Sequence, residues 1–151
     1  MSGLTPKTAN YEQRVRDSFQ RQGIMHTIGA TLESIAPGEV AIRFAPNDAL
    51  SQQHGFVHAG VVATVLDSAC GYAAFSLMPE NAGVLTIEFK ISLLAPAEGD
   101  HLVATGRVRK PGRNITFAEG EIHGFSGGQA KLVATMSASM MTILGREGVV
   151  D

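Results

Sequence analysis

The sequence has no tryptophan, one cysteine and little charge, since only 17% of its 151 residues are Asp, Glu, Lys or Arg. The single cysteine, Cys70, excludes a disulfide framework within the chain and favours a cytoplasmic location. Twelve basic residues against 14 acidic ones give a net charge of −2, which excludes nucleic-acid binding through bulk positive charge. Residues 1–7 contain no apolar stretch and are therefore not expected to form a signal peptide.

The composition is that of a folded protein. Hydrophobic residues make up 44% of the chain, which excludes intrinsic disorder. A length of 151 residues suits a single domain, because domains usually have about 100–200 residues. We therefore expect one domain over residues 1–151, with the polar residues 1–9 forming a loose N-terminal tail.

Residues 59–78 form a long apolar stretch, AGVVATVLDSACGYAAFSLM, which ends before Pro79. As a helix this stretch is apolar on every side, so it must be buried all round. A membrane span is the alternative, because about 20 mainly apolar residues cross a bilayer. However, Asp67 in mid-span would cost about 2.5–3.5 kcal/mol, and no Lys or Arg closely flanks either end. The sequence therefore predicts a buried helix and no membrane span.

The rest of the chain predicts a short helix and an antiparallel sheet. Residues 10–22 suit a helix that Asn10 can cap, and residues 27–36 and 39–45 suit a hairpin. Four further strands joined by short turns are expected at residues 85–93, 101–109, 114–123 and after residues 127–128. We expect an α+β fold with a curved antiparallel sheet around the long helix. Either the sheet wraps this helix or a second subunit covers it.

Asp67 is the only charged residue in the long helix, and no Lys or Arg lies within two helical turns of it. Burial of an unpaired carboxylate costs several kcal/mol, or the group takes up a proton instead. In a structural interpretation, Asp67 accepts a hydrogen bond from a backbone amide or Ser68 at a helix or subunit contact. In a functional interpretation, Asp67 is a general base or nucleophile in a partly dry cleft.

The start of the same helix offers a second chemical feature. Free N–H groups at a helix N-terminus favour developing negative charge, so the N–H of Ala59 suits an oxyanion site. Asp67 follows Ala59 by eight residues, which corresponds to about 12 Å along a helix. The two groups cannot contact one atom within a single subunit. A site that uses both must combine two subunits, which predicts a homo-oligomer.

Other motifs do not indicate a different chemistry. The glycines at 55 and 60 are not followed by the Lys and Ser or Thr of a phosphate-binding loop. His54 and His58 have the spacing of a zinc-binding pair but lack the intervening Glu, so no metal is expected. Cys70 has no obvious His base, and we expect it to be a small buried side chain.

Three short motifs together resemble a known family. His58-Ala59-Gly60, with Asp67 nine residues after His58, is similar to the His-Gly-Gly…Asp signature of hotdog-fold acyl-CoA thioesterases of the phenylacetate-degradation (PaaI-like) type. Residues 84–97 resemble the family's strand that leads into a Pro-Ala turn. Residues 110–113 resemble its later Gly-Arg hairpin. The resemblance covers about residues 27–142.

The resemblance implies a hotdog fold, a homotetramer built as a dimer of dimers, and hydrolysis of an acyl-CoA thioester without a cofactor. By position, Asp67 would be the catalytic carboxylate, acting as general base or nucleophile. The Ala59 N–H would hold the thioester oxygen with help from Gln52, and Thr86 would orient water. The resemblance also implies that four residues bind the substrate: His58, Gly60, Gly112 and Arg113. The last three of these would lie near the CoA phosphates.

Two positions differ from the family's pattern, and the strand face of Thr86 sets a further condition. Ala59 stands where the family has Gly, but only its N–H is required. Gln52 replaces the commoner Asn and has a longer reach. Thr86 lies on the polar face of its expected strand, away from the packed helix, so it can act only if that face meets a partner subunit.

Two other functions stay open. A hotdog hydratase or dehydratase would act on the same acyl carriers with a His and an acid. A non-catalytic module would bind an acyl-CoA or a lipid without turnover.

Overall fold

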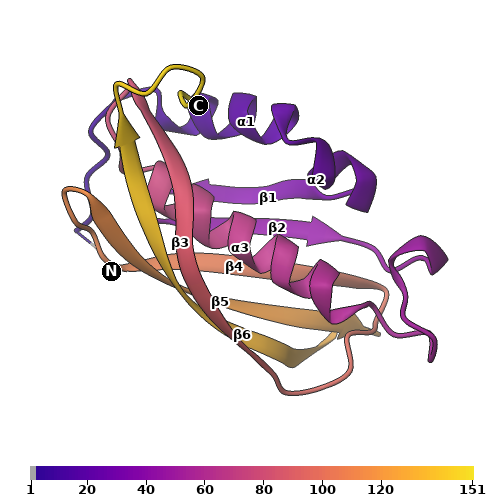
Figure 1. The fold of residues 1–151 in the computed structure, drawn as a ribbon. Helices are drawn as coiled ribbons and strands as arrows, with labels where there is room; N and C mark the ends of the chain where they lie inside the picture. The colour runs from indigo at the N-terminus through magenta and orange to yellow at the C-terminus, as the bar shows by residue number, and fades with distance from the viewer. Residues whose placement is uncertain (1–2) are drawn as a thin grey trace.

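The computed structural model describes residues 3–151. The helices are α1 (Tyr11–Arg21), α2 (Gly23–Ile28) and α3 (Ala59–Phe75), with a short 3-10 turn at Asp48–Leu50. The strands are β1 (Thr31–Ala36), β2 (Glu39–Phe44), β3 (Ala82–Leu93), β4 (His101–Lys110), β5 (Ile115–Ser126) and β6 (Gln129–Leu144). They form one antiparallel sheet in the order β1-β2-β4-β5-β6-β3. Figure 1 shows this sheet curving around α3, which confirms the predicted α+β architecture.

Helix α3 approaches the sheet closely at two glycines that face each other on β4 and β5. Gly106 pairs with Gly120 in the β-ladder. A Cβ atom on Gly106 would lie 2.4 Å from the backbone carbon of Ala69, and one on Gly120 would lie 2.9 Å from Cys70 Sγ. The missing side chains therefore let the middle of α3 pack directly on the sheet, and this contact fixes the depth of the helix.

Substitution of Gly106 by Ala is expected to lower the free energy of unfolding by about 1–3 kcal/mol, because the added methyl group forces α3 away from the sheet. For a chain of this size each kcal/mol lowers Tm by about 2–4 °C. Gly23→Ala is the matched control, because a Cβ there meets nothing within 4 Å. Equal Tm values for the two variants in thermal unfolding would show that the close packing at Gly106 is not needed.

Two predicted boundaries are wrong near the ends of helices. The expected strand at 27–36 begins only at Thr31, because α2 occupies residues 23–28 and ends at Gly29 in a left-handed conformation with φ 74°. The long helix ends at Phe75 rather than residue 78. The N–H groups of Leu77 and Met78 bond three residues back, a tighter turn that precedes Pro79. Asn10 precedes α1 but its side chain makes no capping hydrogen bond.

Strand β3 lies at one edge of the sheet and is only half covered. Its alternating apolar side chains Leu85, Ile87 and Phe89 are 44%, 47% and 44% exposed. The N–H and C=O groups along a free strand edge can pair with another chain. An exposed edge with apolar side chains is therefore a surface suited to a second copy.

One face of α3 also remains partly open. The buried residues of the helix include Val62, Leu66 and Ala69, which pack on the sheet. Ala59 and Gly60 are exposed, and Asp67 is only half-buried. The prediction that the helix is buried all round is therefore wrong for a single chain. Within residues 3–151, no helix has both the length and the hydropathy needed to span a membrane.

Candidate active site

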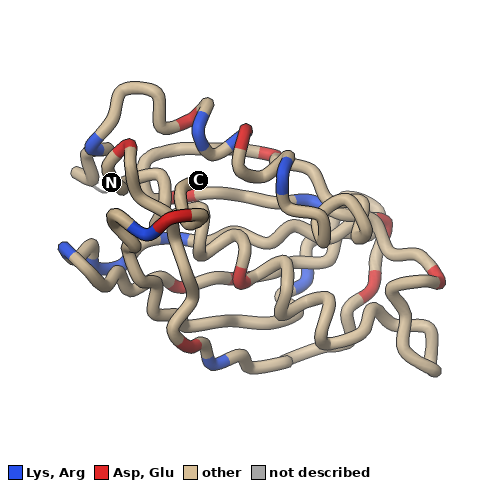
Figure 2. The backbone as a smooth tube through the Cα atoms, turned by 45° about the horizontal axis from the view of Figure 1, so that its top comes forward, with Lys and Arg blue, Asp and Glu red and all other residues tan. Residues whose placement is uncertain are grey.

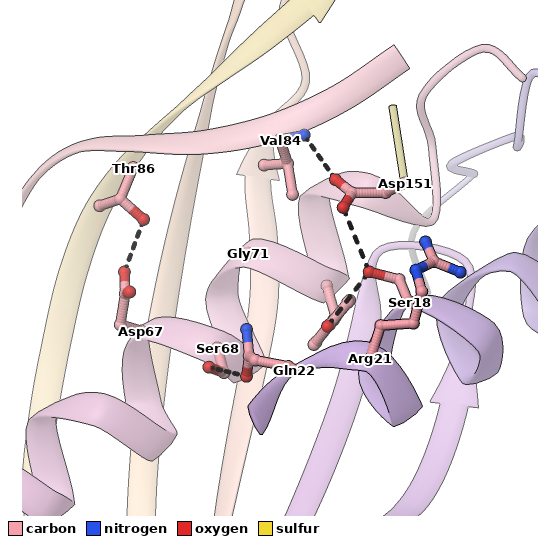
Figure 3. A pocket seen from close by; sticks show the side chains of 10 residues that line it. Ser18, Arg21, Gln22, Asp67, Ser68, Gly71, Val84, Thr86 and Asp151 are labelled. Atoms are coloured by element: carbon pink, nitrogen blue, oxygen red, sulfur yellow. Dashed lines mark hydrogen bonds between the residues drawn. The ribbon is translucent and has the colours of Figure 1, made fainter. Parts of the chain in front are cut away.

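Asp67 projects from the middle of α3 toward β3, into a cavity of about 250 Å³. The Thr86 hydroxyl donates a hydrogen bond to Asp67 Oδ1 at 2.8 Å, as Figure 3 shows. None of the ion pairs among residues 3–151 involves Asp67. Burial raises the pKa of the Asp67 carboxyl above its ordinary value, and the hydrogen bond from Thr86 opposes this in part. The site thus holds a half-buried carboxylate with one neutral donor.

Thr86 lies on the same face of β3 as the buried Ala82, and a β-bulge separates it from Glu88. Thr86 pairs with Met140 on β6, but the next pair is Glu88 with Ser139, so Ile87 is an extra residue. The extra residue shifts the alternation of side chains between the two faces of the strand. The expectation that Thr86 points away from the packed helix is therefore wrong. Thr86 meets Asp67 within the same chain.

The cavity has a second wall that the sequence did not reveal. At the α1–α2 junction, Gln22 accepts a hydrogen bond from Ser68 Oγ through its Oε1 atom at 2.9 Å. Ser18 and Tyr72 lie with their hydroxyl oxygens 3.2 Å apart. Arg21 lines the same cavity. In the structural interpretation, Ser68 is one of two possible donors to Asp67, but the Ser68 hydroxyl donates to Gln22 instead.

The helix start forms a separate pocket of about 410 Å³, lined by Gln52, His58 and Ala59 among others. His58 Nδ1 accepts a hydrogen bond from the Gly60 N–H at 2.8 Å and caps the helix. A Cβ on Gly60 would lie 3.0 Å from that Nδ1 atom, so glycine at this position permits the cap. No acceptor for the Ala59 N–H occurs among residues 3–151.

Gln52 lines the same pocket as Ala59, and half of its side-chain amide is already hydrogen-bonded. Its Oε1 atom accepts a hydrogen bond from the His54 N–H. The Nε2 group remains as the donor that can assist Ala59. Asp67 does not line the pocket at the helix start, and Ala59 does not line the Asp67 cavity. Within one chain, Asp67 and Ala59 therefore line two separate pockets.

Gly112 and Arg113 lie at the β4–β5 turn, where basic positions gather in Figure 2. Neither residue lines the Asp67 cavity or the pocket at the helix start. A Cβ on Gly112 would lie 1.8 Å from the Ile115 carbonyl oxygen, so the turn itself requires glycine. Arg113 is exposed. A single chain does not bring these two residues to the other candidate site residues.

Two other possible nucleophiles, Cys70 and Ser126, lie in surroundings that do not suit nucleophilic catalysis. Cys70 is fully buried, as predicted, and burial raises its pKa to about 12. Residues 124–128 read Gly-Phe-Ser-Gly-Gly and match the Gly-x-Ser-x-Gly pattern of serine hydrolases. That nucleophile lies between a strand and a helix, whereas Ser126 ends β5 at a turn between two strands.

Comparisons with known proteins show the family of the chain. A model of the Thioesterase superfamily matches residues 54–131, just over half of the 151-residue chain. The crystal structure of a thioesterase family protein from Silicibacter pomeroyi matches this chain with a TM-score of 0.88. The two sequences are 52% identical, and the match covers 89% of this chain and 99% of that one. Human acyl-coenzyme A thioesterase 13 is 25% identical over 116 residues, which are 76% of this chain and 82% of that protein.

The PaaI protein from the phenylacetic acid degradation operon of E. coli supports the fold. Its structure has a TM-score of 0.81 at 21% identity and covers 95% of this chain and 98% of that one. Together with the match to the family model, this likeness confirms the predicted hotdog fold and the PaaI-like resemblance. The chain belongs to the Thioesterase superfamily and is a thioester hydrolase.

Proposed function

We propose that the protein hydrolyses the thioester of an acyl-CoA to the free acid and CoA, with Asp67 as general base or nucleophile. The observation that carries this proposal is the Asp67 carboxylate, which is half-buried in a cavity with no cationic partner among residues 3–151. The name of the human relative, an acyl-coenzyme A thioesterase, supports the choice of substrate.

The contacts of Asp67 suit either role. Because Thr86 donates to Oδ1, the Oδ2 atom is free to accept a proton from water or to attack the thioester carbonyl. As a general base, Asp67 takes a proton from water while the water oxygen bonds to the carbonyl carbon. The carbon–sulfur bond then breaks and the CoA thiolate leaves. As a nucleophile, Asp67 bonds to the carbonyl carbon, the carbon–sulfur bond breaks, and the CoA thiolate leaves an acyl anhydride on Asp67, which water then cleaves to the free acid and the Asp67 carboxylate.

The developing negative charge on the carbonyl oxygen needs a donor, and the Ala59 N–H is suited to this role. In one chain it opens into a different pocket from that of Asp67. We therefore propose that each site combines Asp67 of one copy with Ala59 of another. The exposed apolar edge strand β3 offers the surface for such pairing. The predicted homotetramer, its cytoplasmic location and the absence of a cofactor belong to the same proposal.

We propose that the CoA part of the substrate lies along the helix start and an exposed basic turn. His58 and Gly60 border the Ala59 N–H. Arg113 and the backbone at Gly112 are placed at the β4–β5 turn, where a cationic side chain can contact phosphate. Because Gly112 and Arg113 line neither the Asp67 cavity nor the pocket at the helix start within one chain, the partner copy supplies them in this proposal.

The function is tested by measuring thiol release from a panel of acyl-CoAs. The proposal predicts stoichiometric free CoA and free acid. A hydratase would convert an enoyl-CoA without releasing thiol, and a binding module would retain acyl-CoA without turnover. Either of these results would replace the proposed function.

The decrease of kcat at low pH should follow the titration of Asp67. Only the carboxylate form can act as base or nucleophile, so kcat falls as pH drops through the pKa of Asp67. Because burial raises that pKa above 3.8, the fall is expected at higher pH than for an ordinary Asp. A kcat that stays constant down to pH 3.8 with the fold intact would contradict the assignment.

A further inference from the structure

The segment after β6 turns back, and its Asp151 lines the cavity that contains Asp67. Gly145 and Gly148 have φ angles of 67° and 77°, a left-handed conformation that glycine adopts readily. These two glycines reverse the chain, so that residues 149–151 return to the first residues of β3. In Figure 1 the end of the chain lies beside α1.

Two contacts fix this segment against β3. A Cβ on Gly83 would lie 2.8 Å from the Val149 carbonyl oxygen and 2.9 Å from its Cγ1 atom. Glycine at this position therefore leaves the space in which Val149 packs. In addition, the Val84 N–H donates a hydrogen bond to Asp151 Oδ2 at 3.0 Å.

The Asp151 carboxylate also reaches α1. The Ser18 hydroxyl donates to Asp151 Oδ1 at 3.4 Å. As Figure 3 shows, Asp151 thus bridges β3 and α1 at the end of the cavity away from Thr86, while Asp67 lies at the other end. Both carboxylates line the same cavity.

We propose that Asp151 is a specificity-determining residue, whose carboxylate closes the cavity beyond Asp67 and restricts the enzyme to short acyl groups. This inference rests on the proposed function, because it places the acyl group between Asp67 and Asp151. Its thioester carbonyl lies at Asp67 and its far end points toward Asp151.

The size and lining of the cavity support a short acyl group. Its volume is about 250 Å³, below the range of about 300–1,000 Å³ common for pockets that hold drug-sized ligands. A long alkyl chain would have to displace Asp151 and break the hydrogen bonds that it accepts from the Val84 N–H and the Ser18 hydroxyl. Ser18, Arg21 and Gln22 make the same end of the cavity polar, which further disfavours an alkyl tail.

The inference is tested by the acyl-length profile of kcat/KM, measured with straight-chain acyl-CoAs from acetyl-CoA to palmitoyl-CoA. Asp151→Ala removes both hydrogen bonds that hold the segment. The ratio of kcat/KM for octanoyl-CoA to that for acetyl-CoA is expected to rise at least about tenfold in this variant, the size of effect that pocket dimensions produce. Gly83→Ala displaces Val149 by an independent route and should shift the ratio in the same direction.

Two further variants separate closure from charge. Glu147→Ala removes an exposed acid of the same segment and should leave the ratio unchanged. Asp151→Asn keeps the size of the side chain and should also stay close to the wild-type ratio. A rise in Asp151→Asn equal to that in Asp151→Ala would show that charge rather than closure limits chain length, and would overturn the inference.

An unchanged profile in both Asp151→Ala and Gly83→Ala would also overturn the inference. The proposed function would stand in that case, provided that Asp67→Asn is inactive in the same assay. Activity in Asp67→Asn would instead remove the proposed function itself. The two failures are therefore distinguishable in a single set of measurements.

Discussion

Asp67→Asn is expected to lower kcat for acyl-CoA hydrolysis by about 10²–10⁴-fold, the contribution typical of a positioned general base. The amide has nearly the same shape and can still accept the hydrogen bond from Thr86, but it cannot take a proton from water or attack the carbonyl. The change therefore removes the chemistry and leaves the contacts. Thiol release under saturating acyl-CoA measures the effect.

The same variant should not lose stability at neutral pH. Burial raises the pKa of Asp67 in the folded chain, so the contribution of this group to stability is greatest at low pH. That contribution is lost as pH rises from the unfolded pKa through the raised folded pKa. At pH 7 the charged carboxylate therefore destabilises the folded state, and substitution by Asn removes this destabilisation. We expect a Tm equal to or above that of the wild type.

Asp17→Asn is the matched control, since it makes the same change at an exposed position of α1 where Gln13 donates to the side chain. It should keep wild-type kcat. If Asp67→Asn also kept a kcat near wild type, Asp67 would be a structural residue and the mechanism would be wrong.

Ala59→Pro is expected to lower kcat by about 10²–10³-fold, because it deletes one oxyanion donor. The substitution suits the local backbone. Ala59 is the first residue of α3, where proline is well tolerated because its missing N–H has no partner within the helix. His58 has φ −61° and ψ 139°, the extended conformation that a residue before proline prefers. The helix should therefore form normally without the N–H.

Ala59→Gly is the control for this change, because it alters the side chain and keeps the N–H. Its kcat should fall much less than that of Ala59→Pro. Circular dichroism and Tm check that both variants fold. Equal kcat values for the proline and glycine variants would exclude the Ala59 N–H as the oxyanion donor.

The sequence singled out the candidate site residues that local chemistry marks. A lone carboxylate in an apolar helix singled out Asp67, and the helix start singled out Ala59. The curved antiparallel sheet followed from alternating strands and short turns. In each case the information lies within a few consecutive residues, so spacing alone is sufficient.

The sequence did not predict features that depend on packing between distant segments. The bulge at Ile87 places Thr86 and Glu88 on opposite faces of β3, and no residue type marks it. Ser18, Gln22 and Asp151 meet the Asp67 cavity only through the placement of α1 and the return of the chain after β6. Helix α2 was missed because its six residues are too few to show a period.

The most direct test of the account is the activity of mixed oligomers that contain Asp67→Asn and Ala59→Pro copies. Each variant alone should be nearly inactive. If every site combines Asp67 of one copy with Ala59 of its partner, a mixed pair has one intact site and one doubly defective site. Random exchange of the two variants should then restore about a quarter of wild-type thiol release. No recovery in subunits shown to have exchanged would contradict the shared site.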